Sequence, residues 1–146
     1  MTFNKKLLSA LIGGVLATAA SAQTVRIANQ GDALSLDPHS LNESLQLSVD
    51  SNAYEALVGW NKKLEMVPML ATSWKQSTPT VWRFELRKGV QFHDGTPFTA
   101  DDVLFTLGRI MADGSDMKSY GTDIKESRKI DSHTIEIETK APQPIL

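Results

Sequence analysis

The sequence predicts an α/β fold, with a mixed sheet built from hairpins and two main helices. Residues 81–86 alternate strictly between apolar and charged side chains, which is typical of a half-buried strand. Residues 43–58 and 99–111 carry apolar side chains three and four residues apart, which form one face of a helix. Residues 124–139 have the pattern of two strands joined by a turn.

Composition and charge exclude several classes of protein. The 146 residues are 41% hydrophobic and 22% charged, as in a globular chain rather than a disordered one. Fifteen Lys and Arg stand against seventeen Asp and Glu, a formal net charge of -2. Because no surplus of cations is available for a phosphate backbone, we expect no nucleic-acid partner. The sequence has no cysteine, which excludes disulfides, thiol nucleophiles and Cys-type zinc sites.

Residues 1–22 have the pattern of a cleavable signal peptide. Lys5 and Lys6 precede an apolar run over residues 7–20, and residues 20–22 (ASA) form a small-residue cleavage motif. A membrane anchor is the alternative, but the run is shorter than the roughly 20 residues that a spanning helix needs. We therefore expect cleavage after Ala22, export, and no stable membrane insertion.

The mature chain is expected to begin with a strand and a loop. Residues 24–28 alternate around two β-branched side chains and predict a short strand. Proline crowds the residue before it, so Asp37 is excluded from the helical region, and residues 36–42 should form an exposed loop. The helix of residues 43–58 follows.

The middle of the chain is expected to consist of turns and short strands. Residues 60–64 suit a turn, and Pro68 begins the segment that leads to Trp74. After the strand of residues 81–86, residues 90–92 predict a short returning strand, and Gly95 lies in a tight turn.

The second helix and the last hairpin complete the predicted elements. The Thr99 hydroxyl is placed to cap the helix, and Asp102 lies at the positive end of its dipole. Gly114 is expected to end this helix. In the hairpin, Ile135 and Ile137 should face inward.

No pattern in the sequence indicates catalysis. The three histidines, His39, His93 and His133, lack the spacing of metal ligands, and we expect a surface position for each. Nucleophile-elbow, phosphate-loop and dinucleotide motifs do not occur in the sequence. We therefore expect no enzymatic activity, no metal and no cofactor.

Five motifs follow one another in a fixed order. They are residues 35–39 (SLDPH), 54–57 (YEAL), 68–74 (PMLATSW), 82–90 (WRFELRKGV) and 92–103 (FHDGTPFTADDV). In this combination the chain resembles the family 5 extracellular solute-binding proteins, the dipeptide, oligopeptide and nickel receptors of ABC importers. The resemblance extends over essentially all of the mature chain. Because members are several times longer, it implies that this sequence is the N-terminal portion of one.

The resemblance implies a two-lobed, class II periplasmic-binding-protein-like fold, present here only in its N-terminal part. Residues 1–22 would be the signal peptide, residues 23–58 the first segment of lobe I with a connecting helix, and residues 59–146 a truncated second lobe that is an insert of this family. The implied function is that of a monomeric periplasmic receptor without enzymatic activity. It would bind a small solute, above all a di- or oligopeptide, and deliver it to ABC permease and ATPase subunits.

The resemblance also implies ligand-binding residues. The loop after the first strand reaches the cleft in this family, which places Asn42, Glu43, Ser44 and Leu45 near the ligand backbone. Tyr120 lies where some relatives present an aromatic side chain to the cleft. The residues that pair with the ligand charges are expected beyond residue 146.

Alternatives stay open for both the residues and the function. Glu43 could instead be the first-turn acid of the following helix, and Met117 competes with Tyr120 for the aromatic position. A secreted hydrolase with catalytic residues beyond residue 146 is the main alternative function. A structural or adhesive surface domain is another, but it would be expected to show repeats, which the sequence lacks. The sequence does not select among peptide, nickel complex and other solutes.

Overall fold

The computed structural model describes residues 24, 26 and 28–144. Contacts divide the chain into two units, Met1–Gln30 and Gly31–Leu146. The predicted signal peptide, residues 1–22, lies outside the described residues. All the described helices and strands belong to the second unit.

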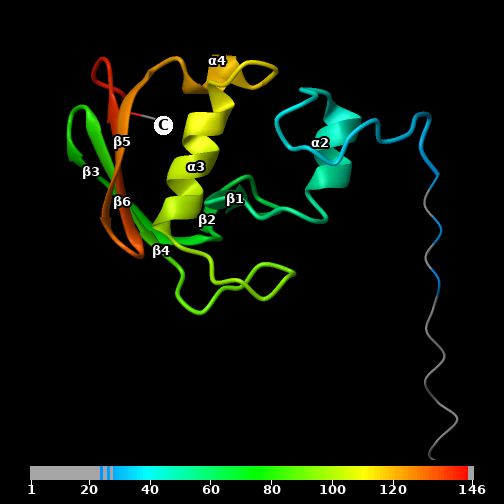
Figure 1. The fold of residues 1–146 in the computed structure, drawn as a ribbon, viewed down its shortest axis with the longest axis horizontal. Coiled ribbons are helices and arrows are strands. Elements are labelled where there is room, and N and C mark those ends of the chain that lie inside the picture. The colour runs from blue at the N-terminus through cyan, green and yellow to red at the C-terminus, as the bar shows by residue number, and fades with distance from the viewer. Residues whose placement is uncertain (1–23, 25, 27, 145–146) are drawn as a thin grey trace, which may run out of the picture. The chain divides into compact units, whose positions relative to one another are not determined.

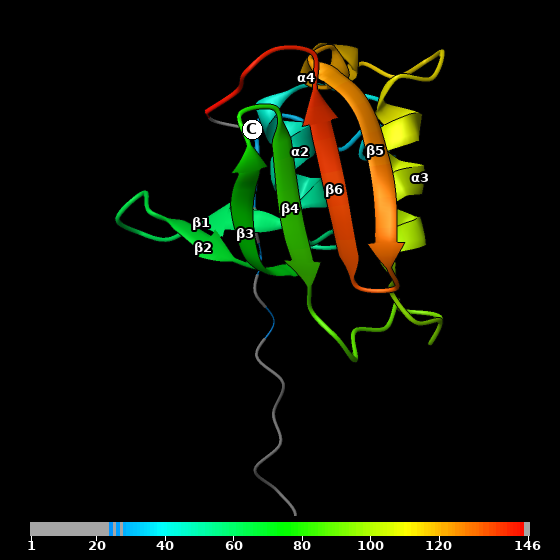
Figure 2. The ribbon, with the colours of Figure 1, turned by 90° about the vertical axis from the view of Figure 1, so that its left-hand side faces the viewer.

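A four-stranded antiparallel sheet forms the centre of this unit (Figures 1 and 2). Its strands are β3 (Ala71–Thr78), β4 (Val81–Leu86), β5 (Ile124–Asp131) and β6 (Thr134–Thr139). They lie in the order β3-β4-β6-β5, with Phe84 opposite Ile135 between the two central strands. Two hairpins, β3–β4 and β5–β6, therefore meet at the middle of the sheet, which confirms the predicted strand at residues 81–86 and the predicted hairpin at residues 124–139.

Helix α3 (Ala100–Ile110) connects the two hairpins and covers one face of the sheet (Figure 1). A capping box at Thr99 fixes its start, with the Thr99 amide donating to Asp102 Oδ2 at 2.7 Å. The helix begins where the sequence predicts, but it ends at Ile110 and not at the predicted Gly114. Gly114, with φ of 85°, lies in the turn beyond it.

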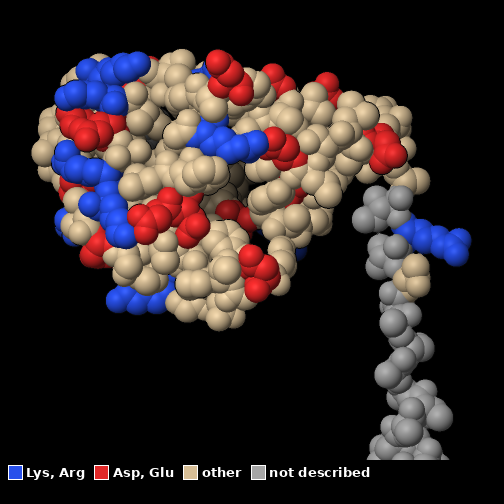
Figure 3. All heavy atoms as spheres, in the orientation of Figure 1, with Lys and Arg blue, Asp and Glu red and all other residues tan. Residues whose placement is uncertain are grey.

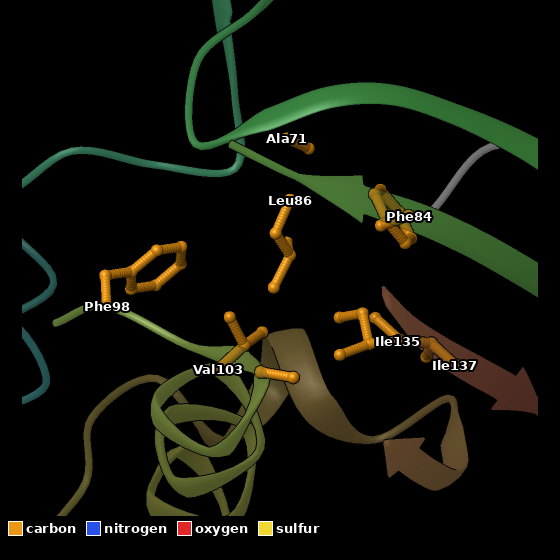
Figure 4. Close-up of a cluster of buried hydrophobic side chains, with 8 residues drawn as sticks. Ala71, Phe84, Leu86, Phe98, Val103, Ile135 and Ile137 are labelled. Carbon is orange, nitrogen blue, oxygen red and sulfur yellow. The ribbon is translucent and has the colours of Figure 1, made fainter. Parts of the chain in front are cut away.

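The core lies between α3 and the sheet (Figure 4). Its buried side chains are Ala71, Phe84, Leu86, Phe98, Ala100, Val103, Ile135 and Ile137. Ile135 has no exposed surface, and Ile137 is 3% exposed, so both face inward as predicted. The strict alternation of β4 explains the arrangement, since every second side chain of a strand points to the same face.

The opposite face of the sheet carries rows of paired charges. Arg128 on β5 contacts Glu136 on β6 at 2.8 Å, and Arg83 on β4 reaches the same carboxylate at 3.5 Å. Lys125 pairs with Glu138 at 2.6 Å. Figure 3 shows basic and acidic side chains interspersed over the side where these strands lie. Exposed pairs of this kind contribute little stability, so burial on the α3 side dominates.

The first helix is shorter than predicted. Helix α2 spans Ser44–Asp50, whereas the apolar spacing predicted a helix over residues 43–58. The side-chain amide of Asn52 donates to the carbonyls of Ser48 and Val49 at 2.9 and 3.1 Å. The Ser51 hydroxyl also donates to the Ser48 carbonyl. These polar side chains satisfy the last carbonyls of the helix and end it there.

The remaining elements are small. A hairpin of β1 (Val58–Trp60) and β2 (Met66–Pro68) encloses the predicted turn, and α4 (Lys118–Gly121) precedes β5. The described part of the chain contains no helix long and apolar enough to cross a membrane.

Two strand predictions need correction, and strand β3 has no predicted counterpart. Strand β3 was not expected, because residues 71–78 are largely polar and lie at the sheet edge, where alternation is weak. Residues 90–92 contribute only an isolated bridge from Gln91 to Pro97. The predicted strand at residues 24–28 does not form at residues 24, 26 and 28, since no described segment pairs with it; residues 25 and 27 lie outside the described set.

Substitution of the central core residue tests this packing. We expect Ile135→Ala to lower the free energy of unfolding by about 2–5 kcal/mol, because it leaves a cavity between α3 and the sheet. Ile130→Ala, in the same hairpin at a side chain that is 44% exposed, should cost far less. Urea denaturation of the two variants measures the difference, and equal losses would contradict the assignment of the core.

Candidate functional site

The candidate site is the loop of residues 31–43 together with the first turn of α2. Within the described residues, this loop contains no strand and no helix. Its last residue, Glu43, is extended (φ -123°, ψ 142°) and occupies the N-cap of α2. The predicted loop is therefore confirmed, but its predicted exposure is wrong for residues 37–41, of which His39 is buried and the others are half-buried. The loop leads directly into the segment expected to meet a ligand.

The predicted ligand-binding residues divide into two places. Asn42, Glu43 and Ser44 are exposed at the start of α2, and Leu45 beside them is half-buried. The Glu43 carboxylate makes no capping hydrogen bond, and Glu43 lies before the first turn rather than within it. Tyr120 is 66% exposed on α4. No hydrogen bond found among the described residues joins its side chain to the other four.

The alternative to Tyr120 occupies a different environment. Met117, the N-cap residue of α4, is only 8% exposed, and its side chain is apolar. Tyr120 therefore offers more surface to a ligand than Met117 does. Its role stays a prediction.

An ion pair fixes the middle of the loop. The guanidinium of Arg109, in the last turn of α3, donates from Nη1 to Asp37 Oδ1 at 2.7 Å and from Nη2 to Asp37 Oδ2. Nη1 also contacts His39 Nδ1 at 2.8 Å. Asp37 Oδ1 accepts the His39 amide at 3.0 Å, so one carboxylate both shapes the turn and receives the arginine fork.

The ionisation of these groups follows from their contacts. Hydrogen bonds from Arg109 and from the His39 amide hold the pKa of Asp37 well below its usual range. Burial lowers the pKa of His39, and the Arg109 charge acts in the same direction, while Asp37 opposes both. His39 is 9% exposed, so the predicted surface position was wrong for this histidine. The side chain that it contacts, Arg109, lies on a helix 70 residues away, which the local sequence does not reveal.

Gln46 holds the start of the loop. Its Oε1 accepts the amides of Leu34 and Ser35 at 3.1 and 3.4 Å. Its Nε2 donates to the Ser35 carbonyl and to the Asp50 carboxylate, at 3.0 Å for Oδ2. Gln46 and Asp50 are 3% and 4% exposed, and these bonds explain how two polar side chains lie buried on a short helix.

A cavity of about 810 Å³ lies next to this region. Phe98, Phe105 and Tyr54 contribute much of its apolar wall, and His39 and Arg109 contribute polar atoms. Its size is within the range of small-molecule sites. None of the residues predicted to bind ligand lines it, so the cavity and the predicted contact segment are separate features.

The structure reveals two functional candidates that sequence reasoning missed. Arg109 had no visible partner in sequence, because Asp37 precedes it by 72 residues. Gln46 lies within the predicted helix of residues 43–58, outside its apolar face, so the sequence did not indicate that it is buried. The available signal was the SLDPH motif itself, since an aspartate fixed before a proline needs a cation or amides to satisfy it. Among the described residues, no cluster of three His, Cys, Asp or Glu side chains could hold a metal ion.

The sheet order, the covering helix and the loop that precedes them define part of a class II periplasmic-binding-protein fold. Residues 65–146 match the family model described as "Bacterial extracellular solute-binding proteins, family 5 Middle". The chain belongs to this family.

Three similar proteins show the extent of the match. The glutathione-binding protein GsiB of Escherichia coli K12 is 31% identical over 125 residues, which cover 84% of this chain and 24% of that protein. The structure of the E. coli murein tripeptide binding protein MppA matches with a TM-score of 0.70 and 27% identity, over 77% of this chain and 26% of that one. The structure of DppA from Helicobacter pylori in complex with the peptide STSA matches with a TM-score of 0.66 and 30% identity, over 76% and 26%. The chain thus spans about a quarter of the length of these relatives.

Acidification tests the environment of His39. Because folding lowers its pKa, the unfolded chain takes up the proton at higher pH than the folded chain. The stability contributed by neutral His39 is therefore present above about pH 6.5 and is lost as the pH falls below that value. Urea titrations between pH 7.5 and 5 should show this loss.

A histidine-specific comparison isolates the effect. His39→Gln should reduce the loss of stability on acidification, whereas His93→Gln, at an exposed position, should behave like the parent chain. An identical pH dependence in the parent and His39→Gln would contradict the burial of a neutral histidine.

Proposed function

We propose that this chain forms the N-terminal part of a periplasmic receptor that binds short peptides and delivers them to the permease and ATPase subunits of an ABC importer. Membership of the solute-binding family carries this proposal. The names of similar proteins support peptides in particular: glutathione for GsiB, a murein tripeptide for MppA and the peptide STSA for DppA. Residues 1–22 would direct export, and the receptor would act as a monomer.

The proposed receptor leaves its ligand chemically unchanged. The carboxylate of the candidate site, Asp37, already accepts hydrogen bonds from Arg109 and from the His39 amide. A carboxylate whose pKa is held far below its usual range is a poor general base at neutral pH. A hydrolase is therefore not favoured by the groups that this part of the chain provides.

Residues 42–45 are the proposed contact segment. The loop ends in three exposed residues, Asn42, Glu43 and Ser44. Their amide, carboxylate and hydroxyl groups are accessible for hydrogen bonds with an extended peptide. Leu45 would contribute apolar contact, and Tyr120 an aromatic surface. The partners of the ligand's charged ends would lie in later parts of the complete protein.

Thermal unfolding of the complete protein tests the function. A ligand that binds only the native state stabilises it by about 2.7 kcal/mol at a concentration one hundred times its Kd. We therefore expect trialanine or glutathione to raise the melting temperature, and nickel–histidine and maltose to leave it unchanged. No shift with any di-, tri- or tetrapeptide would overturn the proposal.

Substitution in the contact segment tests the residues. We expect Asn42→Ala to weaken peptide binding about five- to tenfold, as for the loss of one or two hydrogen bonds. Ser48→Ala, on the exposed side of the same helix, is the matched control and should bind like the parent. Calorimetric titration with the peptide that gives the largest thermal shift measures both. Equal affinities would remove Asn42 from the site.

A further inference from the structure

The loop that leads to the contact segment has little backbone structure of its own. Among residues 31–42, the one internal backbone hydrogen bond that we find runs from the Ser40 amide to the Asp37 carbonyl, at 3.1 Å. The His39 carbonyl accepts one further bond, from the Asp116 amide at 2.8 Å. A segment with so few backbone bonds opens easily unless side chains hold it. Its conformation therefore depends on side-chain contacts.

The side-chain contacts differ in where they come from. Gln46 lies on α2, directly after the loop, and ties Leu34 and Ser35 to that same helix. The Tyr54 hydroxyl, just beyond α2, donates to the Leu36 carbonyl at 2.7 Å. Arg109 lies on α3, which packs on the sheet, and is separated from Asp37 by 72 residues. Gln46 therefore fixes the loop to its own continuation, whereas Arg109 fixes it to the packed core of the unit.

The geometry at Arg109 requires an arginine. Two nitrogens of the planar guanidinium meet the two oxygens of Asp37, and one of them also contacts His39 Nδ1. A lysine ammonium carries the same charge but cannot form this fork. The C-terminal turn of α3 is also a favourable place for a cation, because the helix dipole is negative there.

We propose that Arg109 is a positioning residue for the ligand-contacting segment of residues 42–45. It touches Asp37 and His39, which lie five and three residues before Asn42, and sets the path by which the loop reaches α2. It acts on ligand affinity through this loop and not through contact with the ligand. The inference rests on the proposed function, because residues 42–45 matter for affinity only if the protein is a receptor.

Two measurements on the complete protein test this role. Arg109→Gln should raise hydrogen exchange of the amides in residues 36–43 about tenfold or more, and should weaken peptide binding about tenfold, as for the loss of a charge-assisted pair. Exchange in β4 and β6 should stay unchanged. Arg109→Lys keeps the charge without the fork and should give an intermediate effect on both quantities.

Two further variants separate positioning from general stability. Arg128→Gln removes another arginine that pairs with a carboxylate, Glu136, but on the outer face of the sheet, so it should leave loop exchange and affinity as in the parent. Asp37→Asn should change loop exchange and affinity in the same direction as Arg109→Gln, because both substitutions disrupt the Arg109–Asp37 fork. Each residue also makes its own contact with His39, so the effect of the double variant should exceed that of either single variant but should be smaller than the sum of the two.

The positioning role fails under several outcomes. Unchanged loop exchange in Arg109→Gln, or an affinity equal to that of the parent, would overturn it. If faster exchange spread over β4 and β6 as well, Arg109 would be a residue of general stability, and the role would also be overturned. If the parent protein bound no peptide at all, the proposed function would fail, and the positioning role, which concerns ligand affinity, would fall with it. The exchange comparison needs no ligand and would then still decide whether Arg109 holds the loop.

Discussion

The packing of α3 on the β4–β6 face is the constraint on which the rest of the structure depends. Val103 on the helix lies against Ile135 and its neighbours on the two central strands, and the capping box at Thr99 fixes where the helix begins. Once that face is buried, the last turn of α3 lies at a defined place. Arg109 can then donate hydrogen bonds to Asp37, which lies in a loop that has almost no backbone hydrogen bonds of its own. The ion pairs on the other face of the sheet contribute much less to stability than this buried apolar packing does, because water screens them.

Much of this arrangement was predictable from local patterns. Alternation identified β4 and the β5–β6 hairpin, since a half-buried strand leaves a two-residue period in its sequence. Thr99 and Asp102 marked the start of α3 to the residue, because a capping box needs those side chains at that spacing. The five ordered motifs indicated the family, which residues 65–146 confirm. These are the features for which a few neighbouring residues determine the structure.

Other features leave no apolar pattern in the sequence and were missed. Strand β3 is polar, and it forms because β4 beside it offers hydrogen bonds. The α2 helix ends early because Ser51 and Asn52 compete for its carbonyls, an effect that apolar spacing does not register. His39 is buried, and its side chain contacts Arg109, which lies 70 residues away on another helix. The candidate site itself was located only through the family resemblance. The side-chain contacts of Arg109 and Gln46 that hold its loop were visible only in the structure.

Under the proposed function, this part of the receptor would present residues 42–45 to a ligand and would perform no chemistry on it. Native mass spectrometry of the complete protein, incubated with a tripeptide and then denatured, tests this claim most directly. We expect a one-to-one complex in the native spectrum and, after denaturation, a peptide of the mass supplied together with an unmodified protein. Release of shortened peptide, or a covalent adduct on the protein, would contradict binding without chemistry.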